Sequence, residues 1–251
     1  MKRWLKTLLG WLGYRVEGTR YVPRQLRDPG ALLRPTLHDA LCRRMVERGP
    51  ALTFLQIGAF DGVMSDPLRD YIVRHGWRGV MVEPQPGPYA KLRTLYADNP
   101  GIVVVQAAID AAAGQRPLYV VEAPPGAVPA WAGGLASFDR GSIEKVAAQI
   151  PGIDRMIASV PVECRTFDSV LALLPYASLD VLQIDVEGAD GYLLSLFPFE
   201  RLRPAIVHFE IKHLTMAERE SCLARLIAHG YRIAPPDGEN MLAVLSGSAR
   251  G

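Results

Sequence analysis

The stretch FLQIGAFDGVMSDP, residues 54–67, decides the fold because it joins an apolar strand to a turn flanked by glycines. The apolar run at 52–58 is short and ends at glycine, which is typical of a parallel strand buried on both faces. Gly58 and Gly62 would let the backbone approach a ligand closely, although a purely structural turn would also use them. A dinucleotide fingerprint needs GxGxxG, whereas this turn reads GAFDG. NAD and FAD are therefore disfavoured, and a cofactor without phosphates stays open.

Strands and helices alternate on both sides of this stretch. We expect helices at 36–48, 66–76, 86–100 and 216–230, strands at 52–58, 79–84, 102–109, 180–188 and 205–212, and a closing hairpin from 231–236 and 241–246. This alternation predicts an α/β fold with a doubly wound, mostly parallel sheet and helices on both faces. Ligands bind such sheets at the carboxyl ends of the strands, where the strand order reverses. The residues at the strand ends are therefore the candidates for function.

The alternation is interrupted in the middle of the chain. Segments 117–121 and 162–167 predict an extra strand pair, and a short helix is expected near 141–150. Long irregular insertions in compact domains are usually functional lids or disordered segments. We therefore interpret about 122–160 as a lid over an acceptor, with an aromatic and polar set that would equally suit domain packing: Trp131, Ser137, Phe138 and Arg140.

Composition narrows the class of protein. The 251 residues are 49% hydrophobic and 22% charged, which suits one globular domain with a sizeable core, expected over 51–247. A net charge of +2 is too small to indicate a nucleic-acid partner. Three distant cysteines, without zinc spacing, predict reduced thiols and a cytoplasmic location.

The first 50 residues are expected to form a separate region with an amphipathic helix, a linker at 19–35 and a second helix. Trp4, Leu8 and Trp11 fall on one face of residues 1–18, beside several basic residues. This pattern fits either peripheral contact with the inner membrane face or packing on the domain. The segment lacks the apolar core and cleavage site of a signal peptide. No stretch has the roughly 20 apolar residues that would span a bilayer.

Two acidic residues follow the second and third predicted strands. Glu83 lies 21 residues after Gly62, where an acidic residue accepts hydrogen bonds from two ribose hydroxyls. Asp110 follows small apolar residues near Ala108 and Ile109 that would flank an adenine ring. Its side chain would either cap the turn or bind the adenine amino group. Together with the glycines, Glu83 favours a nucleoside ligand.

The segment QIDVEGAD places Asp185, Glu187 and Asp190 at the end of an apolar strand. Carboxylates so close together repel one another unless a positive group lies nearby. That group would be an ammonium, a sulfonium, a metal ion or a basic side chain. Asp190 also fits the first turn of a helix, where the helix dipole favours an acid.

The segment HFEIKHL supplies the candidate base. His208 and Glu210 share one face of a strand by its alternation. Glu210, near the strand end, would act as a base or a ligand. His213, just beyond it, titrates near neutrality and would take a proton from a hydroxyl.

These motifs, taken in order, resemble one family. LQIGAFDG, GVMVEPQP, CRTFDSVL, LDVLQIDVEGAD, FEIKHL and AHGYRI make the chain similar to the FkbM-type S-adenosylmethionine-dependent methyltransferases over about 52–245. The resemblance implies a seven-stranded Rossmann-like sheet and S-adenosylmethionine as cofactor. It also implies a cofactor-binding set of Gln56, Gly58, Ala59, Asp61, Gly62, Glu83, Asp110, Asp185 and Glu187.

The resemblance assigns roles within this set. Gly58 and Gly62 would approach the methionine part, Glu83 the ribose and Asp110 the adenine, while Asp185 would lie beside the transferring methyl group. Gln56 departs from the family, because many of these enzymes carry an acid there that faces the methionine ammonium. That contact would then fall to Asp61 or Asp185.

The resemblance also implies the reaction and its acceptors. The expected reaction is O-methylation of a sugar, a glycan or a natural-product intermediate, with Asp185, Glu210 and His213 as catalytic residues. A divalent metal on Asp185 and Glu210 is a less favoured alternative. Two rival functions stay open: a non-catalytic binding or assembly module on the same fold, and a nicotinamide-dependent oxidoreductase.

Overall fold

The computed structural model describes residues 35–246, apart from 125, 147 and 175–177. The amphipathic segment 1–18 and almost all of the linker lie outside these residues. Among the helices described, none is long and apolar enough to cross a membrane.

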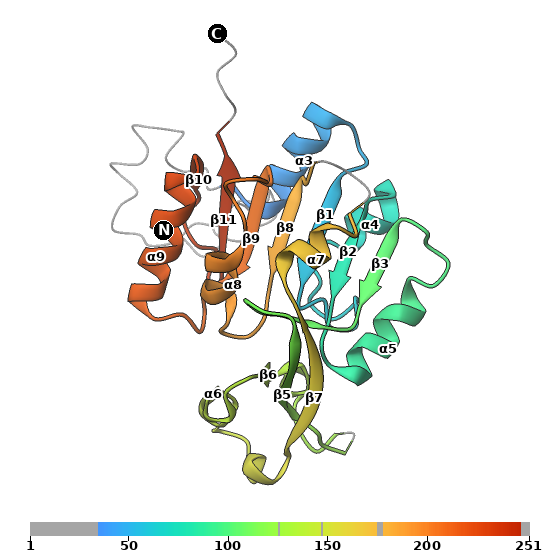
Figure 1. Ribbon diagram of the computed structural model, residues 1–251, viewed down its shortest axis with the longest axis vertical. Coiled ribbons are helices and arrows are strands. Elements are labelled where there is room, and N and C mark those ends of the chain that lie inside the picture. Colours follow the sequence, from blue (N-terminus) through green and yellow to red (C-terminus); the bar gives the residue numbers. More distant parts are fainter. Residues whose placement is uncertain (1–34, 125, 147, 175–177, 247–251) are drawn as a thin grey trace, which may run out of the picture.

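One large sheet forms the body of the molecule (Figure 1). Its order is β10 (Tyr231–Ile233), β11 (Asn240–Leu245), β9 (Ile206–Glu210), β8 (Val181–Ile184), β1 (Thr53–Ile57), β2 (Arg78–Val82) and β3 (Ile102–Val105). The pairs from β9 to β3 are parallel, and β10 and β11 form the antiparallel hairpin at one edge. The seven-stranded, mostly parallel sheet predicted from the sequence is confirmed. The strand order reverses at β1, which β2 and β8 flank.

Helices cover both faces of this sheet. One face packs on α3 (Leu37–Arg48), α4 (Arg69–His75) and α5 (Pro86–Leu95), and the other on α7 (Phe167–Leu171), α8 (Asp190–Leu196) and α9 (Met216–Ala228). Strand alternation divides the two cores, since Phe54 points to the first face and Leu55 to the second. Thr36 begins α3 with a capping box, and the helix buries Ala40 and Leu41 in the first core.

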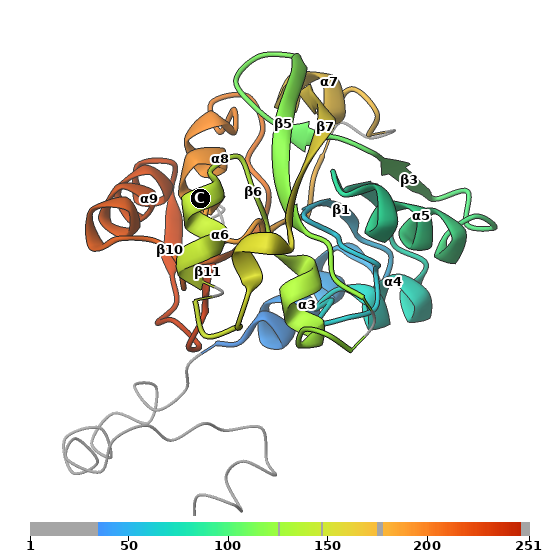
Figure 2. The same ribbon diagram turned by 90° about the horizontal axis from the view of Figure 1, so that it is seen from below.

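A second, four-stranded sheet is inserted between β3 and α7. Its order is β4 (Ala108–Ile109), β7 (Ile157–Arg165), β5 (Gly114–Val121) and β6 (Ala136–Ser137). Short helices η2 (Ala130–Gly134), α6 (Arg140–Val146) and η3 (Ile153–Arg155) complete the insertion. Seen from below in Figure 2, the insertion lies in front of the large sheet, between the α8–α9 side and the α4–α5 side.

Two predicted strands in this region were wrong in extent. The strand expected at 102–109 ends at Val105, and Ala108–Ile109 pair instead with β7 of the second sheet. The strand expected at 162–167 begins at Ile157, and it ends at Arg165 because the Thr166 hydroxyl caps α7 by accepting from the Ser169 N–H. The helix expected near 141–150 covers Arg140–Val146.

Candidate functional site

A cleft of about 600 Å³ opens at the carboxyl ends of β1, β2 and β8. Its walls come from the turn after β1, the residues after β2, segment 107–109, the turn after β8, and the insertion. This is the position where the strand order reverses, and where ligands of doubly wound sheets bind.

Glu83 is the buried anchor of the cleft, with only 3% of its surface exposed. Its Oε2 accepts the Phe60 N–H at 2.9 Å, and its Oε1 accepts the Gln85 N–H at 2.8 Å. Burial raises the pKa of Glu83 to about 7, although these two hydrogen bonds oppose the shift. Each oxygen keeps a lone pair for a further donor, so the carboxylate is both fixed and able to bind.

Of the residues that the glycine motif predicted to contact a cofactor, some line the cleft and others do not. Gly58 and Ala59 line the cleft, and both N–H groups donate to the Val82 carbonyl. A Cβ on Gly58, whose φ is +79°, would lie 1.8 Å from the Asp185 carbonyl oxygen, so only glycine lets β1 and β8 approach here. Gly62 is outside the lining, and its Cβ position faces Leu92 of α5 at 2.6 Å.

Asp61 is placed in the same turn but away from the ligand position. It does not line the cleft, and its Oδ1 accepts the N–H groups of Val63 at 3.0 Å and Met64 at 2.9 Å. The side chain therefore stabilises the local turn. This geometry gives no support to Asp61 as the partner of a cofactor ammonium.

Asp110 supports the cleft through two other side chains. It accepts from the Tyr192 hydroxyl at 2.6 Å and pairs with Arg116. Burial raises the pKa of Asp110, but these hydrogen bonds outweigh it and hold the pKa below its usual value. Arg116 and Tyr192 line the cleft themselves, and the Arg116 guanidinium lies 4.0 Å above the Phe138 ring centroid. Sequence patterns gave no signal for Arg116 or Tyr192, since their importance comes from one buried carboxylate.

The turn after β8 gathers the carboxylates. Asp185 and Glu187 line the cleft, whereas Asp190 is fully buried and accepts the Gly188 N–H at 3.2 Å. Burial, together with repulsion from Asp190 and Glu187, raises the pKa of Asp185 to about 7. Burial raises the pKa of Asp190 to about 6. A positive ligand in the cleft would relieve this repulsion.

Glu210 and His213 lie behind the lining of the cleft, beside Glu187. His213 Nε2 lies 3.2 Å from Glu187 Oε2 and 4.0 Å from Glu210 Oε2, and neither His213 nor Glu210 lines the cleft. Burial and the neighbouring carboxylates raise the pKa of Glu210 to about 8, and Glu187 raises the pKa of His213. Donor atoms of the three residues lie within 4.8 Å of one another, a spacing that would also admit a divalent ion.

A neutral polar row crosses the sheet below the cleft. Gln56, Gln183 and His208 occupy matching positions on β1, β8 and β9, and all three are buried. His208 Nδ1 and Gln183 Oε1 are 2.7 Å apart, and burial lowers the pKa of His208 to about 4. Gln56 and Gln183 line the cleft. The row therefore gives this part of the cleft a polar floor without charge.

The insertion forms one side of the cleft, and its role as a lid over an acceptor stays a prediction. Trp131, Ser137 and Phe138 line the cleft, and Trp131 keeps 43% of its surface exposed. Gln85, after β2, donates through Nε2 to the Gly134 carbonyl at 3.1 Å and fixes the insertion to the main sheet. Arg140 instead bonds within the insertion, to the Asp154 carbonyl at 2.7 Å.

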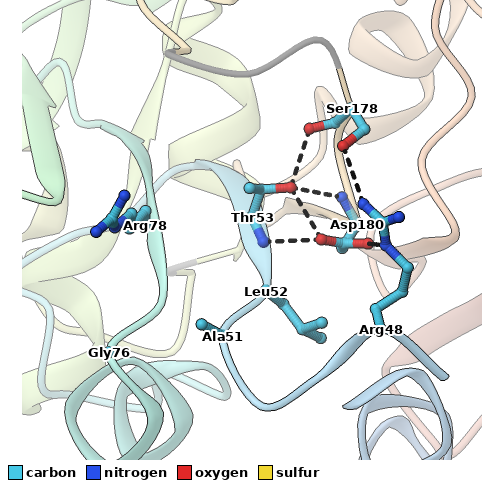
Figure 3. A pocket seen from close by; sticks show the side chains of 8 residues that line it. All are labelled: Arg48, Ala51, Leu52, Thr53, Gly76, Arg78, Ser178 and Asp180. Carbon is cyan, nitrogen blue, oxygen red and sulfur yellow. Dashed lines mark hydrogen bonds and ion pairs between the residues drawn. The ribbon is translucent and has the colours of Figure 1, made fainter. Parts of the chain in front are cut away.

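A second pocket, of about 320 Å³, lies at the amino ends of the strands (Figure 3). Asp180 Oδ2 accepts from the Thr53 N–H at 2.9 Å and from the Thr53 hydroxyl at 3.0 Å. Arg44 forms an ion pair with the same carboxylate at 2.7 Å. These polar groups satisfy one another and join the starts of β1 and β8, so we assign this pocket a structural role.

The sequence matches one family model. The model of the methyltransferase FkbM domain matches residues 56–246, which include every strand of both sheets except the first three residues of β1. The curated proteins contain no significant match to the chain.

Solved structures of methyltransferases are similar to this chain at low sequence identity. An FkbM methyltransferase from Methylobacillus flagellatus KT matches with a TM-score of 0.47 and 14% identity over 78% of this chain and 44% of its own length. A precorrin-6y C5,15-methyltransferase from Geobacter metallireducens GS-15 has a TM-score of 0.39 and 13% identity, with 78% and 81% covered. Aeropyrum pernix fibrillarin, solved with natively bound S-adenosyl-L-methionine, has a TM-score of 0.36 and 13% identity, with 77% and 66% covered.

Proposed function

Because the chain belongs to the FkbM methyltransferase family, we propose that it is an S-adenosylmethionine-dependent O-methyltransferase acting on a hydroxyl of a sugar, a glycan or a natural-product intermediate. The observation that carries the proposal is the Glu83 carboxylate. It is buried beside the glycine turn, fixed by two backbone N–H groups, and open to the cleft. A nucleoside whose ribose hydroxyls donate to one carboxylate fits this arrangement.

The described residues fit the other parts of this cofactor. Ala107, Ala108 and Ile109 line the cleft as a small apolar surface for an adenine ring. Gly58 and Ala59 leave room for the methionine part. Asp185 and Glu187 supply negative charge where a sulfonium would lie. The side chain of Asp110 already holds Arg116 and Tyr192, so it would support the adenine region through them.

The residues around Asp185 would position the acceptor and remove its proton. When bound, S-adenosylmethionine supplies an electrophilic methyl group, so the protein needs mainly to align the acceptor oxygen in line with it. Glu187 touches the cleft and would accept the hydroxyl proton, shared with His213 at 3.2 Å. The nearby charge of Glu210 adds to that of Glu187 in raising the pKa of His213. His213 and Glu210 are thus positioning residues here, not direct contacts.

The acceptor side is formed by the insertion. Aromatic Trp131 and Phe138, with Ser137 and Arg116, offer stacking surface and hydrogen bonds of the kind that a sugar uses. If residues 1–18 contact the inner membrane face, a lipid-linked glycan would be within reach. Peripheral membrane contact and a cytoplasmic location remain part of the proposal.

The test is transfer of a labelled methyl group from S-adenosylmethionine to a panel of sugars, lipid-linked glycans and hydroxylated intermediates. We expect an acceptor to be methylated on oxygen. Glu187→Gln should lower kcat about 10²–10⁴-fold, the usual contribution of a general base, while S-adenosylmethionine still binds. The exposed Glu220→Gln serves as the matched control. Cofactor binding without transfer to any acceptor would favour the non-catalytic module, and binding of NADH instead would favour the oxidoreductase.

A further inference from the structure

Two buried acceptor atoms at one end of the cleft have no hydrogen-bond partner. They are Gln56 Oε1 and Asp66 Oδ2, and both residues line the cleft. Gln56 is only 3% exposed, so water does not readily satisfy its side-chain oxygen. Buried acceptors without partners are costly, and in a cleft they indicate where a ligand donor belongs.

Asp66 is fixed by the start of the following helix. Its Oδ1 accepts the N–H groups of Leu68 at 2.8 Å and Arg69 at 3.2 Å, just before α4. These bonds hold the carboxylate in one orientation and leave Oδ2 for another donor. The Gln56 side chain lies close enough to Asp66 to lower the pKa of its carboxyl, so the two free acceptors belong to neighbouring side chains.

The Asp66 carboxyl supplies negative charge at this position, and the nearby Arg69 partly balances it. Burial raises the pKa of Asp66, while the hydrogen bonds and the charge of Arg69 oppose that shift. Arg69 Nε and the Tyr96 hydroxyl are buried nearby without hydrogen-bond partners, so neither satisfies Asp66 Oδ2. A small cation with several N–H donors would satisfy both free acceptors at once.

We propose that Gln56 Oε1 and Asp66 Oδ2 together bind the α-ammonium of the cofactor's methionine part, with Asp66 supplying the negative charge that position 56 lacks. This inference rests on the proposed function, and it assigns the contact to neither of the residues expected from the sequence. Asp61 is outside the cleft lining, and Asp185 lies among the carboxylates after β8. The sequence did not indicate this pairing, because nine residues, most of them in the turn after β1, separate Gln56 from Asp66.

The test compares two ligands that differ in the amino-acid part. S-adenosylmethionine carries the ammonium, whereas 5′-methylthioadenosine keeps the nucleoside and the sulfur but lacks it. In calorimetric titrations, Asp66→Asn should weaken S-adenosylmethionine binding about tenfold to hundredfold, as expected for loss of a charge-assisted hydrogen bond. Binding of 5′-methylthioadenosine should not change. Asparagine still accepts the Leu68 and Arg69 N–H groups, so α4 should stay intact.

Two further variants keep the test decisive. Asp70→Asn, on the exposed surface of α4, is the matched control and should change neither affinity. Gln56→Leu removes the other acceptor without touching the helix cap, and it should also weaken only S-adenosylmethionine.

The outcomes separate this inference from the proposed function. Equal losses for both ligands, or no loss for either, in Asp66→Asn and Gln56→Leu would overturn the ammonium site. Failure of the unchanged protein to bind either ligand would overturn the proposed function itself, and the ammonium site with it.

Discussion

Single residues at the strand ends set what the cleft can bind. Glycine is needed at position 58 mainly for the packing of the backbone, since any side chain there would collide with the Asp185 carbonyl. Its position brings the turns after β1 and β8 together, and those turns carry the glycine motif and the carboxylates. Gly58, predicted from the sequence to contact a cofactor, therefore also has a structural role: it permits the close approach of the turns after β1 and β8.

We expect Gly58→Ala to destabilise the fold and to abolish cofactor binding. The Cβ would lie 1.8 Å from the Asp185 carbonyl oxygen, so β1 and β8 would have to separate at the cleft. Gly76→Ala is the matched control, because Gly76 also has a positive φ, of +64°, but nothing lies within 4 Å of its Cβ position. Gly76→Ala should cost only about 1–2 kcal/mol, the penalty of the left-handed conformation. Urea denaturation measures both, and equal losses in the two variants would contradict the close-approach argument.

At the scale of elements, the sequence predicted the parallel strands better than the insertion. Strands such as 52–58 and 205–212 are mostly apolar and bounded by turn signals, which is typical of parallel strands buried on both faces. Residues 106–107 show no sequence signal for a strand end, yet the chain passes there from the large sheet to the inserted one. Ala108 and Ile109 pair with β7, and the Asp110 N–H donates to the Arg165 carbonyl. That contact joins residues 55 positions apart, and local pattern cannot specify it. The same limit explains why the sequence did not point to Asp66, Arg116 and Tyr192 as residues of the cleft, whereas Glu83 and Asp185 directly follow apolar strands and were predicted to lie there.

The turns after β8 and β9 should make the unliganded protein less stable as pH rises from 6.5 to 8. In the folded state the pKa values of Asp190, Asp185 and Glu210 are raised to about 6, 7 and 8. The same groups in the unfolded chain ionise near pH 4. The folded state then holds more protons than the unfolded state, so the free energy of unfolding falls as they are released. The raised pKa of His213 acts in the same direction.

Thermal unfolding across this pH range checks the prediction. His208, whose pKa is lowered to about 4, acts in the opposite direction, but its contribution fades as pH rises above its unfolded pKa of 6.5. Glu210→Gln removes one titrating group and should flatten the profile, whereas Glu220→Gln on the exposed face of α9 should leave it unchanged. A profile that rises with pH would show that the cluster does not carry these protons.

At the scale of the whole molecule, two sheets meet over one cleft. The strand ends of the large sheet carry Glu83 and Asp185 on one side of the cleft, and the insertion carries Trp131 and Phe138 on the other. Under the proposed function these would be the cofactor side and the acceptor side. Gln85 joins the two through the Gly134 carbonyl.

Titration of the purified protein with S-adenosylmethionine tests the central claim most directly, beside Glu83→Gln and with NADH as the competing ligand. The account predicts micromolar binding of S-adenosylmethionine, no binding of NADH, and a loss of affinity of at least about tenfold in Glu83→Gln, the scale of a lost charge-assisted hydrogen bond. Circular dichroism of each variant confirms that it is folded. A folded protein that binds no S-adenosylmethionine, or binds it equally well without the Glu83 carboxylate, would contradict the account.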